Sequence, residues 1–160
     1  MQENYVQIML ESLKKKETIL NTISEKNLEQ KAIVEKEDLS FEEFDRIIEE
    51  KAELIRQLDV LDRGFESLYE HIKTELQSEE GKIKYKNEIK EMQESIESIS
   101  EKSASIQVQE KRNKQTIEAA FRSEKEKIKA GKVSSRAAVN YYKTMNQTNF
   151  VQPQFLDKKK

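Results

Sequence analysis

The chain has 160 residues, of which 38% are charged and 35% hydrophobic, and it contains three glycines, one proline and no cysteine. The lack of cysteine excludes disulfides and thiolate metal sites, and so few hydrophobic residues are unusual for a compact globule. We therefore expect one elongated helical protein with a thin core. The start, MQENYVQIML, has no basic region followed by a long apolar run. We expect no signal peptide and no membrane-spanning segment, and we place the protein in the cytoplasm.

The net charge is only −2, but the charges are unevenly distributed. Residues 36–80 carry 15 acidic and six basic side chains, whereas residues 132–160 carry six basic and one acidic. The two segments are therefore complementary in charge, although most charged residues of a helical protein simply face solvent.

The strongest apolar pattern lies between Phe44 and Leu76. With Phe44 at heptad position a, eight of the nine a and d positions are apolar, and Lys51 is the exception. Position e widens the apolar face, and a face three positions wide predicts packing against two or more helices. Gly64 lies beside this seam, where we interpret it as an ordinary helical glycine and not a point of close helix approach. The apolar residues of the face are Phe44, Ile47, Ile48, Leu54, Ile55, Leu58, Leu61, Phe65, Leu68, Tyr69, Ile72 and Leu76.

A first helix is predicted over about residues 2–35, where a weaker a and d series continues. Lys16, Asn27 and Gln30 fall on this series. A buried polar residue there would fix the helix register, but we expect these three side chains to be exposed.

A second helix is predicted to begin at Ser40. Ser40 and Glu43 have the spacing of a capping box, and Leu39 and Phe44 that of a hydrophobic staple. Because the connection to the first helix is short, the two helices should run antiparallel as neighbours.

Beyond Ile72 the apolar series changes phase, and Gly81 lies at the change. A turn near residues 77–82 would give a three-helix bundle, and a continuous helix would give a hairpin with one very long arm. We favour the turn. The next helix should end at Gly131, and its seam thins at Ser103, Glu110 and Asn113. The fold class is thus all-α, with residues 1–131 forming the long-helix domain.

Residues 132–160 are predicted to form a short amphipathic helix followed by a mobile tail. The helix is too short to be stable alone, so it must dock on its own bundle or on a partner. Both alternatives stay open. If the apolar side chains are available, the segment is typical of a partner-binding element. The candidate partner-binding residues are Ala138, Tyr141, Tyr142, Met145, Phe150, Phe155 and Leu156.

Signatures of catalysis are missing from the sequence. His71 is the single histidine, and the chain has neither a calcium-loop spacing nor a glycine-rich phosphate loop. The basic run at residues 158–160 is only a chain end, with no basic stripe interleaved with aromatics. We expect no enzymatic activity, no metal, no cofactor and no nucleic-acid partner.

The segments YVQIMLESLKKKETIL and FDRIIEEKAELIRQLDVLDRGFESLY, together with RAAVNYYKTMNQTNFVQPQFLDKKK, resemble the flagellar export chaperones of the FlgN family of Gram-positive bacteria. The resemblance implies a cytoplasmic, ATP-free chaperone of type III secretion that holds hook–filament junction proteins before export. It also implies contact with the cytosolic domain of the export gate, without membrane insertion. By position, client binding would fall at residues 137–156, including Tyr141 and Tyr142.

Two other functions stay open. The chain is also compatible with a structural coiled-coil rod or stalk of the export apparatus that self-assembles, for example as a homodimer. Alternatively, a chaperone of the same kind would hold the filament cap protein. The wide apolar face favours an intramolecular bundle, and the aromatic tail favours a client.

Overall fold

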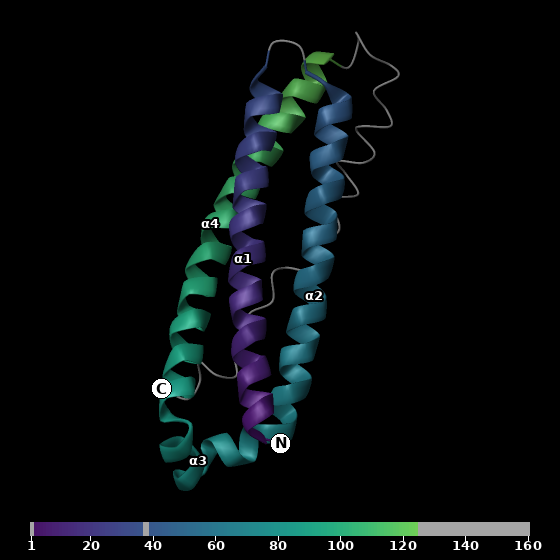
Figure 1. Ribbon diagram of the computed structural model, residues 1–160. Helices are drawn as coiled ribbons and strands as arrows, with labels where there is room; N and C mark the ends of the chain where they lie inside the picture. The colour runs from purple at the N-terminus through teal and green to yellow at the C-terminus, as the bar shows by residue number, and fades with distance from the viewer. Residues whose placement is uncertain (1, 37–38, 125–160) are drawn as a thin grey trace.

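The structure is a computed structural model that describes residues 2–36 and 39–124, and within these ranges it is all-α. Three long helices, α1 (Gln2–Glu35), α2 (Phe41–Gln77) and α4 (Lys86–Glu124), form an elongated bundle, with the short helix α3 (Glu79–Lys84) at one end (Figure 1). The chain reverses between α1 and α2 and again through α3. Helices α1 and α2 are therefore antiparallel, and α4 runs parallel to α1. The predicted three-helix bundle is confirmed, and the single-long-arm hairpin is wrong.

The start of α2 follows the predicted cap. Ser40 is extended, and its side-chain oxygen accepts a hydrogen bond of 3.3 Å from the backbone N–H of Glu43. Leu39 packs against the core. Glu42 and Glu43 lie in the first turn, where negative charge favours the positive end of the helix dipole.

The reversal after α2 depends on Ser78 and Gly81. Ser78 ends α2 by donating its N–H to the Glu75 carbonyl, and its hydroxyl then caps α3 by accepting from the Gly81 N–H at 3.0 Å. A Cβ atom at Gly81 would lie 1.7 Å from the Glu75 carbonyl oxygen. Only glycine therefore fits this turn. Tyr85 ends α3 and leads directly into α4.

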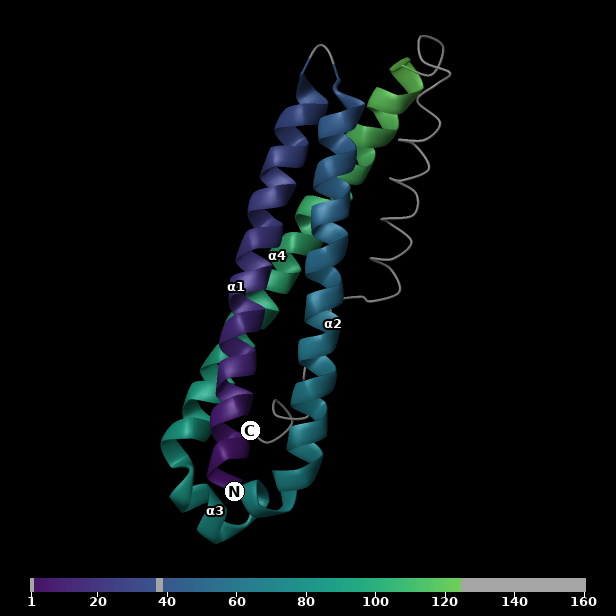
Figure 2. The ribbon, with the colours of Figure 1, turned by 45° about the vertical axis from the view of Figure 1, so that its right-hand side comes forward.

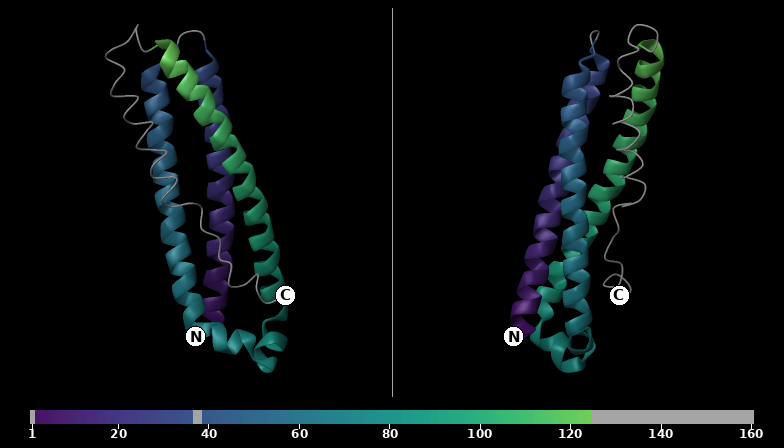
Figure 3. Two further views of the ribbon diagram at one scale, coloured as in Figure 1. Left: turned by 180° about the vertical axis from the view of Figure 1, so that it is seen from behind. Right: turned by 90° about the vertical axis from the view of Figure 1, so that its right-hand side faces the viewer.

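Helix α1 is the common neighbour of the two other long helices, because α2 and α4 both pack along it. Helix α4 crosses obliquely, so its C-terminal end approaches the start of α2 (Figures 2 and 3). There the ring of Phe121 lies 5.5 Å from Phe44, edge to face, and 5.8 Å from Phe41. These aromatic contacts close one end of the core.

The expectation that Lys16, Asn27 and Gln30 are exposed is wrong. Each is no more than 1% exposed. All three face polar groups of another helix, which offsets the cost of removing them from water. The bundle core is therefore apolar with polar layers inserted in it.

The buried face of α2 is also rotated from the predicted one. Among the d positions, Leu54, Leu61 and Leu68 are only partly buried, whereas the apolar e positions are buried. The reason is that α1 and α4 together cover the a and e side. The d side lies at the outer margin of the contact between α1 and α2.

Candidate functional site

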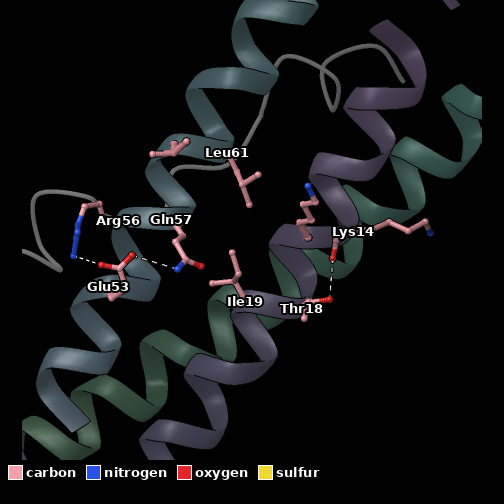
Figure 4. Close-up of a pocket in the computed structure, with 9 residues that line it drawn as sticks. Lys14, Thr18, Ile19, Glu53, Arg56, Gln57 and Leu61 are labelled. Atoms are coloured by element: carbon pink, nitrogen blue, oxygen red, sulfur yellow. Dashed lines mark hydrogen bonds and ion pairs between the residues drawn. The ribbon is translucent and has the colours of Figure 1, made fainter. Parts of the chain in front are cut away.

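An open groove of about 660 Å³ lies at this outer margin between α1 and α2 (Figure 4). It occupies the middle of both helices. The lining residues are Lys14, Lys15, Thr18 and Ile19 from α1 and Glu53, Arg56, Gln57, Val60 and Leu61 from α2.

The groove faces away from α4. On α1, Thr18 lies nine residues before Asn27, whose side chain donates a hydrogen bond of 2.9 Å to Gln109 of α4. On α2, Val60 lies nine residues after Lys51, which forms an ion pair with Glu110 of α4. Nine residues are about two and a half turns, so each groove residue lies on the opposite side of its helix from the residue that meets α4.

The floor of the groove is apolar. Ile19 and Leu61 point toward each other between the two helices and are partly buried. Val60 lies at the rim with 64% of its surface exposed. Ile8, Leu28, Ile83 and Val108 are also exposed in the described part of the chain, but Val60 adjoins two partly buried aliphatic residues in a groove.

The polar rim of the groove is mainly basic. Glu53 forms an ion pair with Arg56 and accepts a hydrogen bond of 3.3 Å from the amide of Gln57. Lys14 and Lys15 are exposed, and neither forms an ion pair with another residue in the described ranges. The carboxylate of the rim is thus already engaged, while two cations face solvent.

A buried polar layer joins all three long helices between the groove and the α1–α2 connection. Lys51 of α2 donates to the side-chain oxygen of Gln30 in α1 at 2.7 Å and to Glu110 of α4 at 2.8 and 3.0 Å. Burial lowers the pKa of the Lys51 ammonium to about 8, and the nearby Glu110 carboxylate opposes this shift. All three side chains of the layer are buried, so it is suited to fixing register.

Two further polar contacts flank this layer. Lys16 of α1 pairs with Asp62 of α2 at 2.7 Å, and burial raises the pKa of Asp62 against the opposing effect of Lys16. Asn113 of α4 donates to the backbone carbonyl of Asn27 at 3.0 Å. Polar side chains therefore pair the helices at several heights, in place of the missing apolar residues.

We looked for a metal centre among residues 2–36 and 39–124. No three histidine or acidic side chains gather there as metal ligands. His71 is exposed, its Nδ1 lies 2.8 Å from the Ser67 carbonyl oxygen, and its ring centre lies 5.9 Å from that of Tyr5. The position of the His71 ring is therefore explained by its contacts with Ser67 of α2 and with Tyr5 near the start of α1.

Within the described part of the chain, no helix is long and apolar enough to cross a membrane.

The predicted partner-binding residues, Ala138, Tyr141, Tyr142, Met145, Phe150, Phe155 and Leu156, lie outside the described residues. The groove was not predicted. Its signal in the sequence is that Ile19 and Val60 are bulky aliphatic residues placed off the heptad seam of their helices. Ile19 packs against the margin of the core and Val60 is exposed, so together they extend the apolar surface beyond the seam.

No family model, no curated protein and no solved structure matches the chain. The functional argument therefore rests on the groove and on the sequence patterns.

Proposed function

We propose that the chain is a cytoplasmic flagellar export chaperone that binds an amphipathic helical segment of hook–filament junction proteins before their secretion. The observation that carries the proposal is the open apolar groove between α1 and α2. The antiparallel helices α1 and α2 lie side by side with an uncovered apolar margin between them. A helix of another protein can pack its own apolar face on this margin. The resemblance of the sequence to the FlgN family supplies the proposed client.

The size of the groove indicates how a client would be held. Its α2 wall, residues 53–61, is roughly 12 Å long, which matches about two turns of a client helix. A stable complex needs about 1,000 Å² of buried surface or more. We therefore propose that the groove anchors the client and that the candidate segment at residues 138–156 adds the remaining contacts. Delivery would follow by contact with the cytosolic domain of the export gate.

Co-expression tests this function. The full chain is produced with a junction protein or with the filament cap protein, and the mass of each purified complex is measured by light scattering. We expect a discrete complex with a junction protein. Val60→Asp should weaken it, because a carboxylate would enter the apolar contact, whereas Val108→Asp, at an exposed valine on α4, should not.

A second variant tests the contribution of residues 138–156 apart from that of the groove. Tyr141→Ala combined with Tyr142→Ala should also weaken the complex if residues 138–156 contribute. If the chain captures the filament cap protein and no junction protein, the cap protein is the client. A stable homo-oligomer that captures neither protein would contradict the chaperone function and favour the structural rod.

A further inference from the structure

We propose that the α1–α2 groove selects a partner helix whose apolar face is flanked by carboxylates. The inference rests on the proposed function and deepens it by naming the chemical class of the helix that is bound. Three observations carry it: the arrangement of charge on the rim, the balanced charge of the neighbouring depression, and the charge of the chain's own C-terminal segment.

The cations of the rim stand on both walls of the groove. Lys14 and Lys15 are exposed on the α1 wall, and Arg56 lies on the α2 wall with 65% of its side chain exposed. Glu53, the only acidic lining residue, shares its charge with Arg56 and Gln57. A helix whose leucines or isoleucines contact Ile19, Val60 and Leu61 would bring its flanking side chains next to Lys14 and Lys15. Carboxylates there would gain favourable electrostatic energy, and ammonium groups would be repelled.

The surface beyond the two lysines limits where such a helix can lie. A smaller depression of about 300 Å³ shares Lys14 and Lys15 with the groove, and Glu11 and Glu91 also line it, so its two cations and two carboxylates balance. An acidic partner gains no net attraction there, whereas the α1–α2 groove has three cations against one carboxylate. Its preferred position is therefore over the groove between α1 and α2, and not over the contact of α1 with α4.

The same charge argument disfavours this chain's own segments as the occupant. Residues 132–160 carry six basic side chains and one acidic, so they offer a single carboxylate to Lys14, Lys15 and Arg56. Residues 36–80 are acidic, but the apolar face of α2 is already buried in its own bundle. A second copy therefore offers no free acidic helix from this region, and the occupant is a different protein.

Two synthetic 18-residue amphipathic helical peptides test the inference. They share one leucine face and differ only in the flanking residues, which are all glutamate in one and all lysine in the other. Binding to the full chain is measured by fluorescence anisotropy at low salt. We expect the glutamate peptide to bind about tenfold or more tightly than the lysine peptide, with the difference reduced at high salt.

Matched variants locate the effect. Lys14→Glu with Lys15→Glu should remove or reverse the preference. Lys31→Glu with Lys111→Glu changes the net charge equally at exposed lysines outside the groove and should preserve it. Val60→Asp should weaken binding of the glutamate peptide by on the order of tenfold, and Val108→Asp should leave this binding unchanged.

Equal binding of both peptides, or an equal effect of the two lysine pairs, would overturn the inference. If the lysine peptide binds as tightly and still depends on Val60, charge selection fails while the proposed capture of a helix stands. If neither peptide binds and no client is captured in co-expression, the proposed function fails as well.

Discussion

At the scale of single residues, the two glycines of the described region have opposite roles. Gly81 is buried in the α2–α3 turn, and a Cβ there would overlap the Glu75 carbonyl, whereas a Cβ at Gly64 would meet no atom within 4 Å. Gly81 was interpreted from the sequence only as a candidate break. The interpretation of Gly64 as an ordinary helical glycine agrees with the open space around it.

Alanine substitution at the two glycines should therefore have opposite effects on stability. Gly81→Ala should lower the free energy of unfolding by about 1–3 kcal/mol, because the backbone of the turn has to shift. Gly64→Ala should raise it by up to about 1 kcal/mol, since alanine is favoured over glycine in a helix. Urea unfolding followed by circular dichroism measures both. Equal destabilisation by the two substitutions would contradict the geometry of the turn.

Lys51 predicts an unusual dependence of stability on pH. Its pKa is about 8 in the folded chain and 10.5 for the ordinary side chain, so between these pH values the unfolded state binds more protons than the folded state. Raising the pH through this window therefore favours folding. The free energy of unfolding of the wild type, measured relative to Lys51→Met at each pH, should rise from pH 8 to pH 10. A difference that falls over this range would show that Lys51 is not buried beside Glu110 and Gln30 as described.

At the scale of the helices, α4 is joined to its neighbours by two kinds of contact. Near its start, Met92, Ile96 and Ile99 are buried in the apolar core, whereas Glu110 and Asn113 bring polar contacts further along. The thinning seam in the sequence predicted a change of character here. It did not predict that the polar residues are buried, because that depends on Lys51 and Asn27, which are far away in the sequence.

The pairing between α2 and α4 can be tested by a double substitution. Lys51→Met alone should destabilise the bundle by about 3–5 kcal/mol, because it leaves the Glu110 carboxylate in the core without its cation. Lys51→Met combined with Glu110→Leu should recover most of this loss, since two apolar side chains of similar volume replace the pair. Denaturant unfolding provides both values. A double variant no more stable than the single one would mean that the ion pair does not join these helices.

The elements themselves were largely predictable, but their mutual rotation was not. The Ser40 cap, the wide apolar face of α2 and the reversal near Gly81 follow from local spacing. The shift of the buried face from a and d toward a and e depends on where α1 and α4 lie around α2. Lys16 illustrates the same limit, because its burial requires Asp62 on another helix.

At the scale of the whole molecule, the groove is a consequence of how three helices are arranged. Because α2 and α4 both pack on α1, the outer margin between α1 and α2 is left uncovered by α4 (Figures 2 and 4). Ile19 and Val60 lie off the heptad seams of their helices, but the sequence analysis did not predict a groove from them. Their convergence on one groove could not be derived before the two helices were placed side by side.

The account's central claim is that this chain covers an amphipathic helix of a client protein. Hydrogen–deuterium exchange of the client, free and in its complex with the full chain, tests this most directly. We predict that one terminal helical segment of the client becomes strongly protected, and that exchange also slows at residues 14–19 and 53–61 of this chain. A complex in which the client's helical segments exchange as fast as in the free client would contradict the claim.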